Sequence, residues 1–536
     1  MASILTNTSA MVALQNLRTI NTNLEETQAM ISTGKAIGSA RDNAAVWAIS
    51  KIMESDSMSF KAINDSLNLG QSTVTVARQA SETITDLLTD MKNKIVAAQE
   101  ENVDRTKIQD DVDAISGQIQ SVVSAAQFNG LNLVTGTEDV NILSSLDRSS
   151  DGTVTASDIT VSRQDLSFDA GVIGTGASLT GGGGSIGTGV LTAADTAASG
   201  GNVAIQAGAG QNFDASSTRD FSNTGNSLTV TVGGTVAADE QFNLQVGQTT
   251  VSFTSAGTVT DDVAAGLTSA LNAAGIENVT ASVAGSVITI TSTNAFEDLT
   301  VNATETSASG TLTAASEAGA GTTAGGGFTG ATIEARASEV TFTSTANVAE
   351  GDGYRVTVGG VNFDYVAGRN ETMEDVARGL KVAIDSGTLA NISTNVTQDS
   401  ATGNWILQVD NDGAALSLAA DGAAGGTATG GLAGVDAIDV TTDEGVEAAL
   451  ANIETFIDIA IDAAADFGSA QGRIDTQSVF ISNLTDSLKA GIGALVDADL
   501  EAASARLQAL QVQQQLGIQS LSIANQAPQS ILSLFR

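Results

Sequence analysis

Residues 64–99 read NDSLNLGQSTVTVARQASETITDLLTDMKNKIVAAQ, and their apolar side chains recur at steps of three and four. Two heptad series result: Leu67, Val74, Leu88 and Ile95, with Ser81 interrupting them, and Ala77, Ile84, Met91 and Ala98. This spacing places both series on one narrow face of an α-helix, with Lys, Asp and Glu opposite. The stretch therefore predicts a coiled-coil seam that must be buried against another helix.

Two other segments carry the same periodicity. One follows Asp104, a plausible N-cap, and Gly130 is placed to supply the left-handed conformation that ends it. The other begins near Val446, on the far side of some three hundred residues of different character. Three long helices with narrow apolar stripes predict an elongated bundle. Its expected core residues are Leu67, Val74, Ile84, Leu88, Ile95, Ile115, Ile119, Leu450, Ile453, Ile457 and Phe467.

The extreme ends of the chain are also helical in pattern but carry few charges. Leu17, Leu24 and Ile31 form one heptad series, and Leu500, Leu507 and Leu521 form another, broken by Gln514. Amide side chains dominate the remaining faces, so each helix can pack against neighbours on every side. Isolated pairs of such helices are marginal in water, and we expect these to become ordered only on assembly. The alternative is an ordinary monomeric helical bundle.

Composition excludes most catalytic chemistry. The chain has no Cys and no His, so disulfides, thiolate nucleophiles and Ser-His-Asp arrangements are impossible. We predict no enzyme, cofactor or metal. Acidic pairs such as Asp261/Asp262 and Glu374/Asp375 could ligate calcium, but we interpret them as charges on the first turn of a helix.

The charge balance excludes other partners. The net charge is −39, and residues 141–440 hold 8 Lys+Arg against 32 Asp+Glu. Nucleic acid and anionic membranes would repel such a surface. No run of about 20 apolar residues predicts a membrane span. The start, MASILTNTSAMVALQNLRTI, does not resemble a secretory signal peptide, so we expect an extracellular form to leave by another route.

The middle of the chain contains an internal repeat. Residues 242–253 match residues 354–365, each as a hairpin with a Gly-containing turn, and DVAAGL at 262–267 matches DVARGL at 375–380. Further strands are expected near 286–290 and 405–409. The unit is β-β-α-β-β, at about 227–304 and 338–419, and a Gly-rich run at 171–201 predicts a linker or loops. The alternative is two unrelated β-rich segments of similar composition.

The ends of the chain resemble bacterial flagellin. The residues that carry the resemblance are Ile4–Ala10 with Asn16-Leu17, Ser32–Asn43, Gln127–Gly130, Asp497–Asp499 and Asn525–Arg536. They stand in the family's order at both ends and cover about 230 residues of the chain. Three positions depart from the family's pattern: Gly38 replaces Asn, Asn43 replaces Asp, and Trp47 replaces a small residue or Leu.

The resemblance implies an α+β fold in which both termini share domains. Residues 1–43 with 493–536 would form inner tube helices, 44–165 with 440–492 an outer tube bundle, and 166–439 a surface-exposed β-rich insert. The implied function is a structural subunit that polymerises into the extracellular filament and is exported unfolded by the flagellar type III system. The polymerisation residues would be Leu17, Leu24, Ile31, Leu500, Leu507, Leu521, Asn525, Gln526, Pro528 and Leu534.

The implied partners are further copies of the chain, the flagellar cap, hook-associated proteins and an export chaperone. Exposed Ser and Thr could accept O-glycans. The first rival function is a hook–filament junction protein, which has similar terminal helices but is present in few copies. The second is a secreted binding module, which the scarcity of aromatic residues disfavours.

Overall fold

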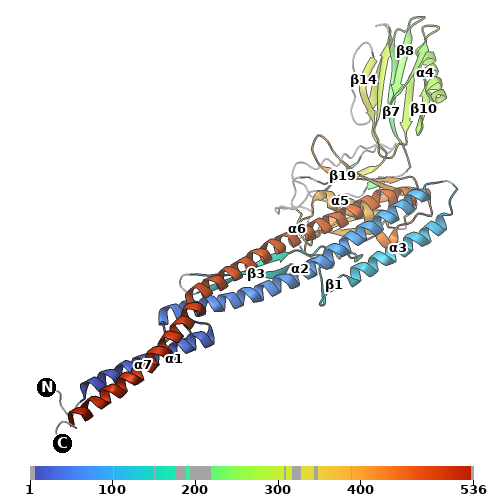
Figure 1. Cartoon of the computed structure of the whole chain (residues 1–536). Helices are drawn as coiled ribbons and strands as arrows, with labels where there is room; N and C mark the ends of the chain where they lie inside the picture. The colour runs from blue at the N-terminus through green and yellow to red at the C-terminus, as the bar shows by residue number, and fades with distance from the viewer. Residues whose placement is uncertain are drawn as a thin grey trace. The chain divides into compact units, whose positions relative to one another are not determined.

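The computed structural model describes residues 7–100, 102–149, 153–176, 189–193, 219–221, 223–306, 310–316, 327–342, 344, 348–387 and 389–532. The chain is α+β, as the sequence predicts: long helices at both ends flank a β-rich middle (Figure 1). The long helices are α1 (Thr8–Thr33), α2 (Ala44–Ala98), α3 (Arg105–Ala125), α6 (Asp443–Val496) and α7 (Leu500–Leu532). No helix in the described ranges is long and apolar enough to cross a membrane.

The chain divides into two compact units, and both contain segments from opposite ends of the sequence. One unit holds residues 1–74, 140–161 and 468–536, and the other holds 75–139 and 162–467. In the first, the Asn64 amide of α2 donates to the Ser478 carbonyl of α6 at 3.4 Å. In the second, Lys92 of α2 forms an ion pair with Glu454 of α6. In both units, helical segments from the two halves of the chain therefore pack together.

The first unit also holds a β-hairpin beside its helices. Strands β3 (Val140–Arg148) and β4 (Val154–Val161) pair antiparallel. The Gln477 side chain of α6 donates to the Ser144 carbonyl of β3 at 2.9 Å. On α2, Gly70 leaves room for Ile142, whose side chain a Cβ at that position would overlap.

The turn after α3 differs from the expectation. Asp104 caps α3 as predicted, accepting from the Lys107 amide at 3.4 Å. Gly130 does have a left-handed φ of 82°, but it does not end the helix, whose last residue is Ala125. Asn129 and Gly130 instead form the turn between strands β1 (Gln127–Phe128) and β2 (Leu131–Asn132). Two consecutive positive φ angles are what a two-residue hairpin turn of type I′ requires.

The first β-domain has two four-stranded antiparallel sheets around one core. Its strands are β7 (Asn226–Gly234), β8 (Gln241–Val246), β9 (Thr249–Thr254), β10 (Val279–Ala284), β11 (Val287–Ser292), β12 (Leu299–Glu305), β13 (Gly310–Ser316) and β14 (Gly327–Ile333). The sheet orders are β10-β11-β7-β13 and β14-β12-β8-β9. Helix α4 (Thr260–Ala274) packs on the edge strands β9 and β10, so these edges are covered.

The second β-domain repeats this plan with a different chain path. Its strands are β15 (Ser338–Phe342), β16 (Gly353–Val358), β17 (Val361–Val366), β18 (Ile392–Gln398), β19 (Trp405–Asn411) and β20 (Leu416–Ala423), with helix α5 (Met373–Asp385). The sheet orders are β18-β19-β15-β5 and β17-β16-β20-β6. Here β5 (Gly189–Ala193) and β6 (Arg219–Phe221) occupy the places of β13 and β14. In the second domain, these two edge positions are therefore filled by strands that precede both β-domains in the sequence.

The position of β5 corrects one expectation. The Gly-rich run 171–201 was expected to be linker or loops, but residues 189–193 within it form this strand, paired with β15. Residues 177–188 and 194–201 lie outside the described residues.

The first β-domain leaves and rejoins the rest of the chain at one place. The Asn226 side chain, at the start of β7, donates to the carbonyls of Glu334 and Ala335 at 3.0 and 2.8 Å. Just beyond, Arg336 donates twice to the buried carboxylate of Asp410, at 2.8 and 2.6 Å. Adjacent termini of this kind allow a whole domain to be inserted into another.

Equivalent side chains make equivalent contacts inside each of the two β-domains. Each has one buried acid just before its first hairpin: Glu240 accepts from the Ala237 amide and Asp352 from the Ala349 amide, both at 2.9 Å. In each hairpin an aromatic pair lies directly opposite in register, Phe242 with Phe253 and Tyr354 with Tyr365.

The second aromatic of each pair packs on a helical glycine. A Cβ on Gly266 would overlap the Phe253 ring, and a Cβ on Gly379 would overlap the Tyr365 ring. The shared Gly of DVAAGL and DVARGL is thus explained by the close approach of a ring to the helix backbone.

Tyr365 also contacts a carboxyl group in an unusual state. Its hydroxyl donates to Glu371 Oε2 at 2.8 Å. Burial raises the pKa of Glu371 to about 7, and the nearby Asp375 charge acts in the same direction. This pair lies where α5 begins, at the wall of a cavity of about 410 Å³ that Phe456 of α6 also lines.

Gly379→Ala should destabilise the second β-domain by about 1–3 kcal/mol, because the new methyl group must displace the Tyr365 ring. The matched control is Gly117→Ala in α3, where an added Cβ meets nothing within 4 Å. That change should be neutral or stabilise by about 0.5–1 kcal/mol, as helix propensity dictates. Calorimetry of both variants checks this, and equal effects would contradict the proposed packing.

Glu371→Gln should change the pH dependence of stability. The folded pKa of about 7 lies above the unfolded value near 4.5, so the wild type loses stability as the pH rises through this window. The glutamine cannot ionise and keeps an acceptor for Tyr365. The variant should equal the wild type near pH 4.5 and exceed it by about 2 kcal/mol above pH 7. Parallel curves in denaturant titrations across this range would contradict the assignment.

Candidate assembly surface

Helices α1 and α7 pair antiparallel along the two ends of the chain (Figure 1). The Asn7 side chain caps α1 by accepting from the Ala10 amide and also donates to the Ala524 carbonyl of α7 at 2.8 Å. Further along, Gln514 Nε2 donates to Asn21 Oδ1 at 2.8 Å. Amide side chains of the two helices therefore form hydrogen bonds that connect α1 to α7.

The apolar residues predicted for polymerisation are only half covered by this pairing. Leu17, Leu24, Ile31, Leu507 and Leu521 are half-buried. Leu500 is 50% exposed, and Asn525 and Gln526 are exposed. Pro528 lies within α7, in a part whose side chains are not described, and Leu534 lies outside the described residues.

The pairing leaves a second set of apolar side chains on these helices exposed. They lie outside the heptad series, so the spacing of apolar residues in the sequence does not single them out. They are Met11, Val12 and Leu14 on α1, and Val512, Leu516, Ile518 and Ile523 on α7, all at least 40% exposed. Two paired helices can bury one face each, so these residues form an uncovered apolar surface, which we call the outer face of the pair. Exposed apolar patches of this kind mark association sites.

The outer face has almost no charge. In α1 the charged residues are Arg18, Glu25 and Glu26, and in α7 they are Glu501 and Arg506. This contrasts with the net charge of −39 for the whole chain. Copies of the chain would therefore repel one another little at this surface.

The motif after α1 builds a compact turn. Gly34 ends α1 with φ 71°, and its carbonyl accepts from the Ala498 amide at 2.9 Å, while the Ala36 amide donates to the Val496 carbonyl at 2.7 Å. Asp42 then accepts from the Ser39 amide at 2.9 Å, which holds its pKa below the usual value. The Ser32–Asn43 and Asp497–Asp499 motifs are thus joined in space, although the sequence separates them by more than 450 residues.

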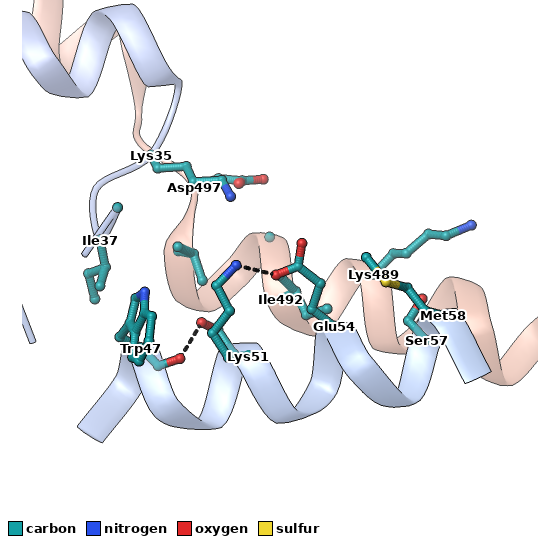
Figure 2. Close-up of a pocket in the computed structure, with 14 residues that line it drawn as sticks. Lys35, Ile37, Trp47, Lys51, Glu54, Ser57, Met58, Lys489, Ile492 and Asp497 are labelled. Atoms are coloured by element: carbon teal, nitrogen blue, oxygen red, sulfur yellow. Dashed lines mark hydrogen bonds and ion pairs between the residues drawn. The ribbon is translucent and has the colours of Figure 1, made fainter. Parts of the chain in front are cut away.

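A cavity of about 290 Å³ lies beside this turn (Figure 2). Trp47 and Lys51 of α2 line one side, and Lys489 and Ile492 of α6 line another, with Lys35 and Asp497 from the turn. Lys51 Nζ donates to Glu54 Oε2 at 2.6 Å. Trp47, one of the three departures from the family's pattern, therefore contributes an aromatic wall to a basic and apolar cavity.

The predicted bundle-core residues lie in the two units as follows. Leu67, Val74, Ile84, Leu88, Ile95, Ile119, Ile453 and Phe467 are buried. Ile115, Leu450 and Ile457 are half-buried. Within the described ranges, no group of three or more His, Cys, Asp or Glu is arranged to hold a metal ion.

Comparison with known proteins gives matches at both ends and along the whole length. The family model for the bacterial flagellin N-terminal helical region matches residues 4–139, and that for the C-terminal helical region matches 450–535. Flagellin B of Rhizobium meliloti is 32% identical over 543 residues, and Flagellin A of the same organism is 31% identical over 542, each covering 100% of both chains.

Among solved structures, a hook-associated protein-3 from Legionella pneumophila aligns with 84% of this chain and 98% of its own, at 10% identity and a TM-score of 0.25. That likeness is too distant to bear on function. The two helical-region matches and the full-length relatives above 30% identity are decisive: the chain belongs to the bacterial flagellins.

Proposed function

We propose that this chain builds the flagellar filament through the outer face of the α1–α7 pair, which packs against the same helices of neighbouring copies. The observation that supports this most is the set of exposed apolar side chains on both helices, of which Ile523 is 70% exposed. Burial of apolar area on this surface would supply the association energy. Uncharged amides such as Gln514 can then hydrogen-bond within the assembly.

As a flagellin, the protein is a structural subunit of an extracellular filament that serves motility, and it is not an enzyme. The proposal concerns how its parts divide that work. Residues 1–43 with 493–536 would form the inner tube, 44–165 with 440–492 the outer tube, and 166–439 the surface of the filament. Contacts between different faces of identical copies propagate without closing, as a helical polymer requires.

The remaining partners belong to the same proposal. The chain would be exported unfolded by the flagellar type III system, with a chaperone, and would assemble beneath a cap on hook-associated proteins. Having no Cys and one Pro supports passage as an unfolded chain, since slow disulfide and prolyl steps are largely avoided. Exposed Ser and Thr on the central domains could carry O-glycans.

Removal of residues 1–40 and 497–536 should abolish polymerisation, because both helices of the pair are lost. Electron microscopy of purified protein with seeds, under salting-out conditions, gives the readout. The full-length chain should form long tubes and the truncated chain should stay monomeric. A full-length chain that never elongates seeds would favour the hook–filament junction protein instead.

Leu516→Ala with Val512→Ala should raise the concentration needed for polymerisation at least tenfold while leaving the monomer folded. Both side chains are more than half exposed in the single chain, so their removal costs packing only where copies meet. The matched control is Leu69→Ala, a side chain 52% exposed on α2 rather than on the pair. Circular dichroism checks the monomer, and sedimentation measures the polymer. Equal polymerisation of both variants would contradict the assigned surface.

A further inference from the structure

The cavity beside the turn after α1 gathers positive charge on a strongly acidic protein. Three of the chain's eight lysines, Lys35, Lys51 and Lys489, line it. Two acids, Glu54 and Asp497, line it as well. We call this site, shown in Figure 2, the lysine cavity. It is a local excess of positive charge on a chain of net charge −39.

The three ammonium groups are unequally satisfied within the chain. Lys51 Nζ lies 2.6 Å from Glu54. Lys489 Nζ is 3.4 Å from Asp486, and both side chains are well exposed, so this pair is weak. Lys35 is exposed and has no ion pair with any described residue. Two of the lysines are therefore available to a carboxylate from outside.

The same cavity has apolar walls. Trp47, Ile37 and Ile492 are half-buried, and Met58 at its rim is 66% exposed. A free phosphate would use the lysines but leave these walls in water. The cavity instead fits an apolar side chain with carboxylates beside it.

The chain itself carries a segment of this chemistry. Every fourth residue of α6 between Glu454 and Asp466 is acidic: Glu454, Asp458, Asp462 and Asp466. Like charges four residues apart on a helix repel, so this stripe destabilises α6 in the isolated chain. Glu454 pairs with Lys92, and Asp466 accepts from Gln164 at 2.7 Å.

The two acids in the middle of the stripe lack such partners among the described residues. Asp458 and Asp462 are exposed and form no ion pair with any residue in the described ranges, and Ile461 between them is 46% exposed. An exposed Ile flanked by two unpaired carboxylates matches the lysine cavity in both charge and polarity.

We propose that the lysine cavity of one copy receives the Asp458–Ile461–Asp462 face of α6 from a neighbouring copy. The inference rests on the proposed polymerisation, and adds to it a second contact made by different residues. Lys35 and Lys489, which lie at opposite ends of the cavity in Figure 2, supply the positive charge that attracts the two carboxylates, and the isoleucine packs against the apolar walls. Such a contact also selects one alignment between copies, since most other alignments bring acidic surfaces together.

Charge reversal in purified full-length protein tests this contact. Lys35→Glu with Lys489→Glu reverses the cavity, and Asp458→Lys with Asp462→Lys reverses the helix face. Each pair alone should raise the critical concentration for polymerisation about tenfold, because two attractions become repulsions. All four changes in one chain should restore it to within about twofold of the wild type.

The matched control is Lys61→Glu with Arg473→Glu, two exposed cations outside the cavity. It changes the net charge as much as the cavity variant does, and should polymerise like the wild type. Circular dichroism confirms that each monomer is folded. The proposed contact would be overturned if the cavity variant polymerised like this control, or if the variant with all four changes had a critical concentration as high as either double variant. Neither result would contradict the proposed filament function. Failure of the wild type itself to polymerise would overturn both.

Discussion

The burial of narrow apolar stripes between helices from opposite ends of the chain is the constraint on which the rest of this structure depends. Neighbouring helices such as α2 and α3 contact each other through Lys94 and Asp111, but α2 also packs against α6, which lies hundreds of residues away in the sequence. The Asn64–Ser478 and Lys92–Glu454 contacts join such distant segments. Everything between α3 and α6 must therefore leave the bundle and return to it. Loop closure grows slowly in cost with length, so a large insert is tolerated there.

The central insert also brings together segments that are distant in the sequence. One β-domain is inserted into another, and the Asn226 side chain holds the two crossing segments next to each other through Glu334 and Ala335. The second β-domain receives the inserted domain. It is completed by β5 and β6, two strands that precede the insertion in the sequence. The bidentate Arg336–Asp410 pair lies at the junction, where both side chains are nearly fully buried. Removing one partner of such a buried pair would leave an uncompensated charge, which is strongly destabilising.

Electrostatics divides the chain into surfaces that repel and surfaces that attract. The first β-domain has no Lys or Arg between Arg219 and Arg336, so it is uniformly acidic. The outer face of the α1–α7 pair is nearly uncharged, and the lysine cavity is locally positive. If copies assemble as proposed, acidic domains would stay solvated while the uncharged and basic surfaces make contact.

Much of the fold could be predicted from local patterns alone. Heptad spacing located the seam of α2, the side chain of Asp104 marked the start of α3, and the 112-residue spacing of Phe242 and Tyr354 identified the two hairpins. These features follow from backbone periodicity and capping, which depend on residues a few positions apart. Two predictions from local sequence were wrong. Gly130 lies in a hairpin turn and does not end α3, and residues 189–193 of the Gly-rich run form a strand, not a loop.

The candidate site was predictable only in part. The sequence by itself determined that both ends are helical, apolar and poor in charge, and hence that they need partners. Only the tertiary structure decided which apolar side chains the α1–α7 pair covers and which it leaves exposed, because burial depends on the partner's position. It alone decided that β5 and β6 complete the second β-domain, since strand pairing is non-local. It also placed Lys489 and Lys35 on the wall of one cavity, which no spacing along the chain can reveal, because the turn beside that cavity is closed by hydrogen bonds between opposite ends of the sequence.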